Sequence, residues 1–391
     1  MRLFKALLPA LGLIVCSGSI EAQQDLVMYN MSIVPQHHYV NPARAPYSRL
    51  NIGLPVISSI YLKHENTVFN PGHLLQETVE GMEFRTDHFM THVKDENFIG
   101  AEGAIDLLSL GIAIGEQHYF SFAIRERMQG RLVLPGDMIR FPFTGNASFD
   151  ELKDNTVDFS GFRIQLNHFR EYGVGWQYDF SEKWNFGARL KLLYGMENID
   201  TKESSLKWET DPTTWDWNFT GEMDVYSSGI WELTDSLDDN TDIENGEIAQ
   251  YLLKRKNKGL GIDLGAEYQV NDKLSVSASL TDLGFISWKT YNRHATTSEG
   301  AFAFTGLELT EQVLNADSTY SDTLDVIIED LLDELEQNFA FKEEAQAYRT
   351  ALFARLHLGA NYKLYENDKT SGTAGLLLQS EFFKGSMRPT A

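Results

Sequence analysis

The sequence of 391 residues contains a single cysteine, Cys16. One thiol cannot build a disulfide framework, a cysteine-based zinc site or an iron–sulfur site. Basic residues are also scarce, since 33 Lys and Arg stand against 56 Asp and Glu and give a net charge of -23. Nucleic-acid binding needs clustered basic side chains to neutralise phosphates. We therefore expect no nucleic-acid partner.

After the N-terminus, the sequence lacks the roughly 18 to 20 continuous apolar residues that an α-helical membrane span requires. The first 22 residues have the pattern of a signal peptide, with Arg2 and Lys5 before an apolar segment over 6–15 and a cleavage point after Ala22. Cys16 follows Val15, whereas a lipidated cysteine normally follows a small residue, so we favour signal peptide over lipoprotein. The sequence thus predicts an exported chain.

What the sequence has is a strict alternation of apolar and polar residues. Between 172 and 194, around a turn at 181–183, one face carries Tyr172, Val174, Trp176, Tyr178, Phe180, Trp184, Phe186, Ala188, Leu190, Leu192 and Tyr194. The opposite face is polar or glycine. A period of two predicts a β-hairpin with one apolar face. The pattern recurs over 260–280, over 352–382 with a turn at 365–371, and less regularly over 105–129.

Such alternation fits a soluble β-sandwich or a membrane β-barrel. The predicted strands have about ten residues, whereas soluble strands most often have about 5 to 6 and tilted bilayer-crossing strands need about 9 to 11. Trp184 and Tyr194 are separated by about 33 Å of strand. At a tilt of about 40° this projects to roughly 25 Å, the height of the apolar band between aromatic girdles. We predict an all-β fold, a transmembrane antiparallel up-and-down β-barrel of the outer membrane.

The short turns of such barrels lie in the periplasm, so the long irregular stretches 227–258 and 284–350 are expected outside, with one more hairpin over 203–226. The phase over 162–172 allows one long strand or a short extra pair. An apolar stripe over 322–338 predicts one acidic helix, either a lid on the loops or a partner-binding helix. The acidic segment 232–247 lacks the calcium-loop residues, since Ile243 and Ala249 stand at two required positions. The basic run 254–258 could meet lipid phosphates or solubilise a strand end.

Catalytic motifs are missing: there is no G-x-S-x-G, no H-E-x-x-H and no P-loop. His88 and His92 could share a face, but two histidines without a third spaced ligand are weak evidence for a metal. We expect no enzyme activity, no cofactor and no metal site.

The segment 23–48 carries Pro35, Pro42 and Pro46, which are unwelcome in the interior of a sheet. We therefore expect it outside the barrel wall, either in the periplasm or inside the lumen.

Several short motifs resemble those of a family of Bacteroidota outer-membrane barrels of unknown function. They are Val34-Pro35-Gln36, Asn41-Pro42-Ala43, Ile52-Gly53-Leu54-Pro55, Leu134-Pro135-Gly136-Asp137 with Gly145-Asn146, Glu171-Tyr172, Lys191-Leu192-Leu193-Tyr194-Gly195, and Asp282-Leu283-Gly284 with Ile286 and Trp288. The Asn-Pro-Ala element is also similar to that of the N-terminal hatch in the long-chain fatty-acid transporter superfamily, which includes the PorV barrel of type IX secretion.

The resemblance implies a signal peptide over 1–22, an N-terminal hatch or plug over 23–48 and a barrel over 49–391. Chains of that family continue with more strands after the position matching Phe382-Phe383-Lys384. We therefore expect a C-terminally incomplete barrel of roughly 14 strands when complete.

Two function hypotheses follow from the resemblance. The first is passive transport of hydrophobic or amphipathic small molecules, with Asn41, Pro42 and Ala43 plugging the lumen. Charged or polar side chains on the inward face would line it, because lipid-facing charge costs about 2 to 4 kcal/mol at the midplane; they are Arg189, Lys191, Asp263, Glu267, Arg355 and His357.

The second hypothesis is a non-transporting structural or interaction barrel, either a type IX secretion partner or a surface scaffold. A small lumen filled by its own side chains would favour it. Both hypotheses include outer-membrane lipid or lipopolysaccharide as a partner. They differ in the additional partner, which is a hydrophobic small molecule in the first hypothesis and a secretion or surface protein in the second.

Overall fold

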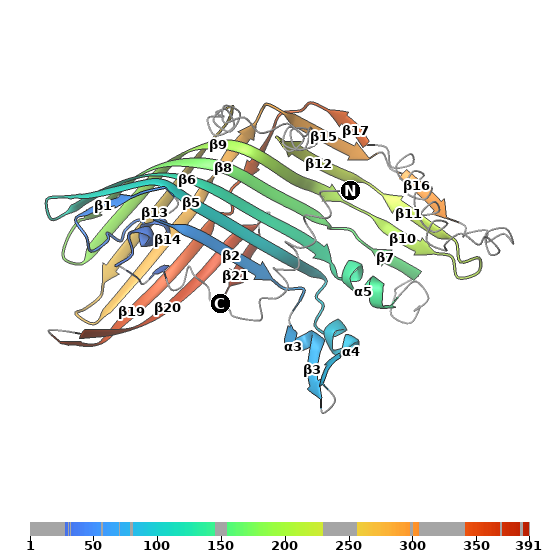
Figure 1. Ribbon diagram of the computed structural model, residues 1–391, viewed down its shortest axis with the longest axis horizontal. Helices are drawn as coiled ribbons and strands as arrows, with labels where there is room; N and C mark the ends of the chain where they lie inside the picture. The colour runs from blue at the N-terminus through green and yellow to red at the C-terminus, as the bar shows by residue number, and fades with distance from the viewer. Residues whose placement is uncertain are drawn as a thin grey trace.

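The computed structural model of the chain describes residues 28–29, 31, 33–55, 58–69, 71–78, 81–144, 155–229, 256–297, 300–304, 341–367, 370–383 and 386–390. Its main sheet follows the order β1 (Leu50–Gly53), β5 (Glu96–Ile114), β6 (His118–Pro135), β8 (Arg163–Asp179), β9 (Trp184–Ser204), β13 (Asn257–Gln269), β14 (Leu274–Trp288), β19 (Arg355–Asn367), β20 (Thr370–Phe383) and β21 (Ser386–Thr390). All these pairings are antiparallel, and consecutive long strands are neighbours (Figure 1).

Shorter strands extend this sheet at its edges. They are β2 (Ile60–Asn66) on β5, β12 (Met223–Ser228) on β9, β15 (Asn292–Thr297) on β12, β17 (Phe341–Glu344) on β15 and β18 (Tyr348–Ala351) on β14. A four-stranded sheet consists of β16 (Gly300–Phe304), β11 (Trp217–Gly221), β10 (Lys207–Thr210) and β7 (Thr156–Asp158). A small unit contains α3 (Pro71–Leu74), β3 (Leu75–Thr78), β4 (Gly81–Phe84) and α4 (Thr86–Met90), and the nine-residue helix α5 (Gly136–Thr144) follows β6.

The alternation that predicted the hairpins also sets the two faces of the sheet. Along β8, the odd-numbered residues from Asn167 to Gln177 are buried, whereas Val174 and Trp176 on the other face are exposed. The buried face is the concave one, because its side chains contact each other across the curve, as Arg127 of β6 and Asp282 of β14 do. The convex face is therefore largely apolar and the concave face polar.

All four predicted hairpins are present, and most of their strands are longer than predicted, whereas β19 begins at Arg355 and not at the predicted Leu352. β8 runs without interruption from Arg163, so the alternative of one long strand is correct. The hairpin over 203–226 is confirmed, since β10 pairs with β11 and Ser204 of β9 pairs with Met223 of β12.

The prediction of an irregular stretch over 284–350 is wrong for the described residues, which include the end of β14 and four short strands, β15 to β18. The connection between β19 and β20 falls within the turn predicted at 365–371 but is shorter, because β19 runs to Asn367, which pairs with Thr370 of β20. A register shift between Lys363 and Tyr365 breaks the alternation there. The predicted acidic helix over 322–338 lies outside the described residues.

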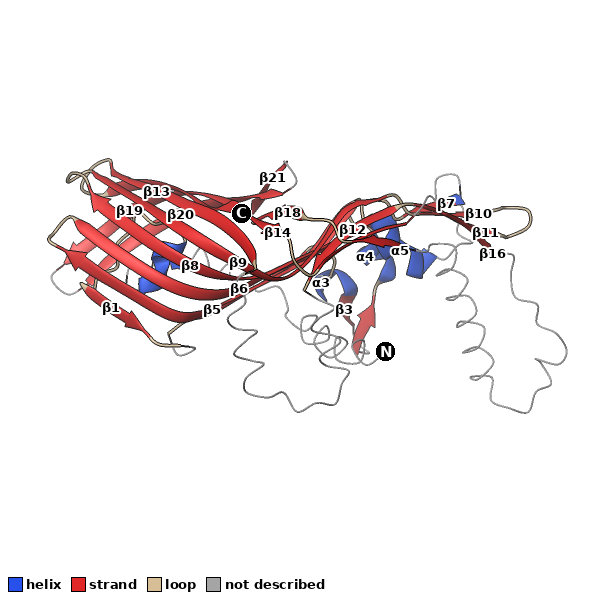
Figure 2. Ribbon diagram, turned by 90° about the horizontal axis from the view of Figure 1, so that it is seen from above, coloured by secondary structure: helices blue, strands red, loops and turns tan. Residues whose placement is uncertain are grey.

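Figure 2 shows the sheet curling around the 3₁₀ helix η1 (Pro35–Tyr39) in one half of the molecule and flattening in the other, towards β7, β10, β11 and β16. Among the strands that the structure describes, no pairing joins β1 or β2 to β20 or β21. Closure of the sheet into a barrel of roughly 14 strands therefore stays a prediction. No helix in the described ranges is long and apolar enough to cross a bilayer.

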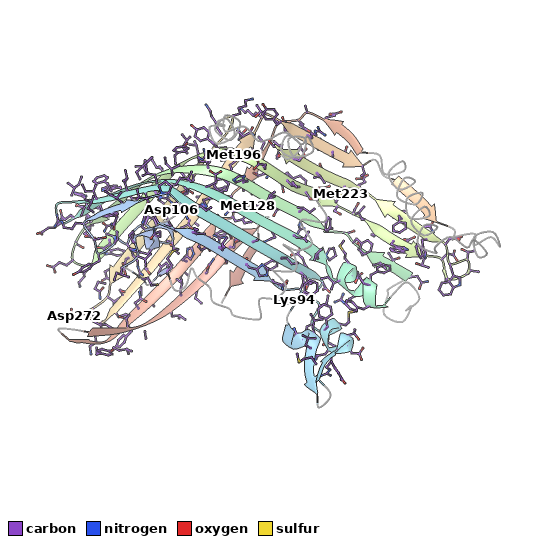
Figure 3. All side chains as sticks on the ribbon, in the orientation of Figure 1. Lys94, Asp106, Met128, Met196, Met223 and Asp272 are labelled. Carbon is purple, nitrogen blue, oxygen red and sulfur yellow. The ribbon has the colours of Figure 1, made fainter. Side chains whose placement is uncertain are left out.

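Two apolar clusters lie away from the convex face. One packs Phe169, Leu193, Ile286, Trp288, Tyr348 and Leu352 on the concave side. The other joins the α3–α4 unit to α5 and β5 through Val68, Phe89, Val93 and Ile139. Figure 3 places Asp106 in the curled half, Asp272 at the tip of the β13–β14 turn and Met223 in the flat half.

Candidate functional site

The candidate site lies on the concave side of the curled half, where η1 and the residues after it meet the strands. Proline at the first position of η1 suits a helix start, since proline has no N–H to leave unpaired there. Asn41 is fully buried and its Oδ1 accepts a hydrogen bond of 3.0 Å from the N–H of Ala43, which forms the turn after η1. Asn41 therefore shapes the segment by a local hydrogen bond.

The same segment is held to the strands by side-chain hydrogen bonds. Asn41 Nδ2 donates to the Tyr29 hydroxyl at 2.9 Å, and this hydroxyl donates to Ser277 Oγ at 2.8 Å. Ser279 Oγ donates to the carbonyl oxygen of Val40 at 2.7 Å. The buried segment is thus attached mainly to β14.

Two inward-facing glycines leave room for this segment. A Cβ atom at Gly187 of β9 would lie 1.9 Å from the carbonyl oxygen of Pro42. A Cβ atom at Gly265 of β13 would lie 2.2 Å from Asn41 Oδ1 and 2.8 Å from the N–H nitrogen of Ala43. The backbone around the predicted Asn-Pro-Ala element therefore rests directly on the wall.

Tyr39, the last residue of η1, sits between two arginines. The guanidinium carbon of Arg125 lies 3.8 Å from the centre of its ring, and that of Arg189 lies 4.6 Å away. Its hydroxyl donates to Asp106 Oδ2 at 3.0 Å, and Arg125 Nε donates to Asp106 Oδ1 at 3.0 Å. A tyrosine ring between two cations gains cation–π attraction from both, so Tyr39 ties η1 to the charged wall.

Next to Tyr39, the strands β6, β8, β9, β13 and β14 contribute six buried charges, which we call the central network: Arg127, Glu171, Arg189, Lys191, Asp263 and Asp282. Arg127 binds Asp282 through both terminal nitrogens, at 2.6 and 2.8 Å, and Glu171 at 2.8 Å. The Lys191 ammonium lies 2.5 Å from Asp263 and 2.7 Å from Asp282. Arg189 lies 2.7 Å from Glu171. Three cations and three anions therefore neutralise each other in the interior.

A second set of buried charges, the cross-sheet cluster, connects the first strands of the sheet to the last ones. Arg355 of β19 forms ion pairs with Glu102 of β5 and, at 3.1 Å, with Glu381 of β20. Arg131 of β6 lies 2.5 Å from Glu381. The Arg355–Glu102 and Arg131–Glu381 pairs span the concave space between strands that are not neighbours in the sheet, whereas Arg355 and Glu381 lie opposite each other on the paired strands β19 and β20.

The predicted site residues therefore fall into distinct groups. Arg189, Lys191 and Asp263 lie together in the central network, and Arg355 lies in the cross-sheet cluster. His357 is buried beside Ser279, at 3.3 Å, close to Tyr29. Glu267 lies apart, at the end of the strands that carries the short β8–β9 and β13–β14 turns, which we call the turn end. It forms an ion pair of 3.0 Å with Arg44.

Further residues of this site were not predicted from the sequence: Tyr39, Glu102, Asp106, Arg125, Arg127, Arg131, Glu171, Asp282 and Glu381. The alternation of β6 and β8 places Arg125, Arg127 and Glu171 on the inward face, so this signal could have found them. Asp282 could not be found in this way. It has a φ of 59°, next to a register shift in the β13–β14 pairing, and this bulge turns its side chain inward against the alternation.

Little free space remains among these side chains. A cavity of about 50 Å³ is lined by residues that include Tyr39, Arg125, Lys191, Asp282 and Arg355. A larger cavity of about 840 Å³ opens at the turn end, beside Arg44, Glu267 and Lys273. η1 and the central network therefore separate the open turn end from the rest of the concave side.

The two histidines of η1 are buried next to these cations. Burial, together with the nearby Arg189 guanidinium, lowers the pKa of His38 to about 3. Burial also lowers the pKa of His37. The Nδ1 atom of His37 bonds the carbonyl oxygen of Val34 at 2.7 Å. The Nε2 atoms of both histidines have no hydrogen-bond partner among the described residues. Both histidines are therefore neutral in the folded chain at neutral pH.

Outside this site, the structure brings His73 of α3 next to His88 and His92. The ring centres of His73 and His92 are 3.8 Å apart, and those of His88 and His92 are 4.6 Å apart. Even so, the described ranges contain no group of three or more His, Cys, Asp or Glu residues that could hold a metal ion.

Comparison with known proteins gives one family. A family of unknown function, DUF5723, matches residues 42–391. The chain belongs to this family. No curated protein and no solved structure matches the chain. Membership of a family of unknown function agrees with the sequence analysis, whereas the likeness to Bacteroidota barrels and to the fatty-acid transporter superfamily stays a prediction. The DUF5723 match includes Pro42, Ala43 and all the strands that carry the central network.

Proposed function

We propose that this DUF5723 protein spans the outer membrane with its strands and has a blocked interior, so that it serves as a structural or interaction platform. The flat half would stand outside the membrane and present its four-stranded sheet to a secretion or surface protein. The observation that carries the proposal is the filled concave side. There η1, the central network, the cross-sheet cluster and the Asp106–Arg125 pair leave a cavity of about 50 Å³.

The convex face supports the bilayer crossing. On β8, Tyr172, Val174, Trp176 and Tyr178 face outward in succession, and the exposed Phe180 follows directly after the strand. From Arg170, the first charged residue in the same alternation, to Phe180 the chain covers about 33 Å. At a tilt of about 40° this is roughly 25 Å, which matches the apolar band of membrane barrels.

The energetics of the central network support the blocked interior. Removing one partner from a buried ion pair costs about 3 to 5 kcal/mol, because the other charge stays buried and unpaired. An apolar solute that crossed this region would have to separate Arg127, Lys191 and Asp282 from each other and offers no charge in exchange. The site therefore favours a closed interior over a path for hydrophobic molecules.

Conductance of the purified protein in planar lipid bilayers tests this proposal. We expect no steady conductance and no uptake of small solutes, both for the intact protein and for a variant without residues 23–48. The heat-modifiable electrophoretic mobility of each variant checks that it is folded. Steady conductance of the intact protein would contradict the blocked interior.

Passive transport of hydrophobic or amphipathic molecules is the second candidate. The cavity of about 840 Å³ at the turn end favours it, because η1 and the residues after it are held against the strands by hydrogen bonds and an ion pair, with no covalent cross-link that would prevent their displacement. This candidate predicts that the variant without residues 23–48 takes up solutes or fatty acids that the intact protein excludes. Absence of flux in both proteins would rule it out.

A further inference from the structure

One row of residues on the outward side of the sheet crosses six strands in register, at the edge of the apolar band that lies away from the short turns. Pairing of β6, β8, β9, β13, β14 and β18 aligns Glu126, Arg170, Tyr194, Lys258, Ser287 and Arg349. The next row towards the short turns is apolar, as Tyr172, Leu192, Leu260 and Phe285 show. The row therefore marks the polar boundary of the band.

Below this row, the convex face has an apolar groove of about 770 Å³. Its lining includes Leu190, Leu192, Leu260, Ile262, Leu283 and Phe285. The paired glycines Gly261 and Gly284 lie at its base, and neither has a side chain to fill it. Leu190 and Leu260 are 64% and 60% exposed. The groove thus offers apolar side chains and a hollow backbone surface to an apolar chain.

Charge along the row is uneven. Arg170 is neutralised by Glu126, with which it makes contacts of 2.6 and 2.7 Å. Lys258 and Arg349 are exposed, and within the described part of the chain neither has a carboxylate partner. The guanidinium of Arg349 lies 5.2 Å from the centre of the Phe285 ring, a groove residue. The two unbalanced cations therefore stand directly above the groove.

Lys258 and Arg349 are two strands apart, which is about 10 Å between their backbones. Both side chains are long enough to reach an anion between them. Lys256 adds a third cation nearby, where its Nζ donates to the Tyr291 hydroxyl at 2.6 Å. The basic run of the sequence thus meets the polar end of an apolar groove, which is the arrangement that an anionic lipid requires.

We propose that this groove binds one acyl chain of a phosphorylated lipid, with a lipid phosphate held between Lys258 and Arg349. The row lies on the side of the apolar band away from the short turns, which such barrels keep in the periplasm, so the lipid would belong to the outer leaflet and be of the lipid A type. This inference rests on the proposed membrane crossing. It is independent of whether the interior is blocked.

Binding of lipid A to the delipidated protein, measured by native mass spectrometry in detergent, tests the proposal. Each basic residue near a membrane surface contributes about 1 kcal/mol of attraction to anionic lipid, so K258Q/R349Q should bind lipid A about thirtyfold more weakly. The matched control K183Q/K207Q removes two exposed lysines far from the groove and should bind like the unchanged protein. Leu260→Trp should also weaken binding by filling the groove.

Three results would overturn the proposal: equal affinity of K258Q/R349Q and the control, equal affinity for dephosphorylated lipid A with the same chains, or no effect of Leu260→Trp. We also expect that inorganic phosphate at the same concentration does not displace the lipid. Displacement would contradict the acyl-chain part of the proposal, because it would mean that the two cations bind phosphate equally well without a chain in the groove. Conductance is measured separately, so an open interior would contradict the proposed function and leave this result intact.

Discussion

At the scale of single residues, Arg127 illustrates how charge can lie inside this molecule. Its guanidinium meets Asp282 and Glu171, and Phe169 lies 5.3 Å below it. Bidentate arginine–carboxylate pairs are among the strongest hydrogen-bonded contacts in proteins. The inward position of Arg189, Lys191 and Asp263 followed from the alternation in the sequence. The ion-pair partner of each charge did not, because partners come from distant strands, as Asp282 is 155 residues from Arg127 and Glu102 is 253 residues from Arg355.

His38 gives a prediction at this scale. Its pKa is about 3 in the folded chain against 6.5 ordinarily, so the folded chain binds fewer protons than the unfolded chain between these values. For this residue, folding is therefore most favourable above pH 6.5. As the pH falls from there towards 3, His38 lowers the free energy of unfolding by up to about 1.4 kcal/mol per pH unit. We expect a lower melting temperature at pH 4.5 than at pH 7.

Comparison of H38Q with H92Q checks the assignment to this residue. His92 is exposed, so H92Q should retain the whole fall in melting temperature between pH 7 and pH 4.5. H38Q should reduce that fall, since glutamine does not titrate. An equal fall in both variants would show that other groups cause it.

At the scale of elements, the hairpins were predictable because strands of 13 residues or more repeat the alternation many times. The strands β15 to β18 have four to six residues, too few repeats to stand out, and they form by pairing with β11, β12, β14 and each other. Their existence depends on tertiary contacts that the local sequence does not encode.

The packing of η1 and the residues after it against β13 can be tested with alanine substitutions at two glycines of this strand, Gly265 and Gly261. An alanine at Gly265 would place Cβ 2.2 Å from Asn41 Oδ1, whereas an alanine at Gly261 would meet nothing closer than 3.5 Å. Overpacking of this kind costs about 1 to 3 kcal/mol. We expect Gly265→Ala to speed hydrogen exchange over residues 39–45 and Gly261→Ala to leave it unchanged. Equal exchange in the two variants would mean that the segment does not rest on Gly265.

At the scale of the whole molecule, the sheet is longer than a bilayer is thick. β9 alone covers about 66 Å, roughly twice the length that a tilted strand needs to cross. The membrane-length part of each hairpin was predictable, because its outward face is apolar without interruption. The continuation of β8 back to Arg163 was one of two predicted alternatives, whereas the continuation of the other strands into the flat half was not predicted, because charges such as Glu126 of β6 interrupt the apolar face there.

The two ends of these strands should therefore face different compartments. The β13–β14 turn, with Asp272 at its tip, and the β10–β11 turn, with Thr213, lie at opposite ends of the molecule (Figure 1). Both residues are exposed, and Cys16 is the only cysteine of the chain, so a cysteine introduced in a Cys16→Ser background is a unique label. In whole cells, a membrane-impermeant maleimide should label Thr213→Cys directly and Asp272→Cys only after the outer membrane is permeabilised. The reverse pattern would invert the orientation, and labelling of both positions in intact cells would contradict the bilayer crossing, because then no membrane would separate the two ends of the sheet.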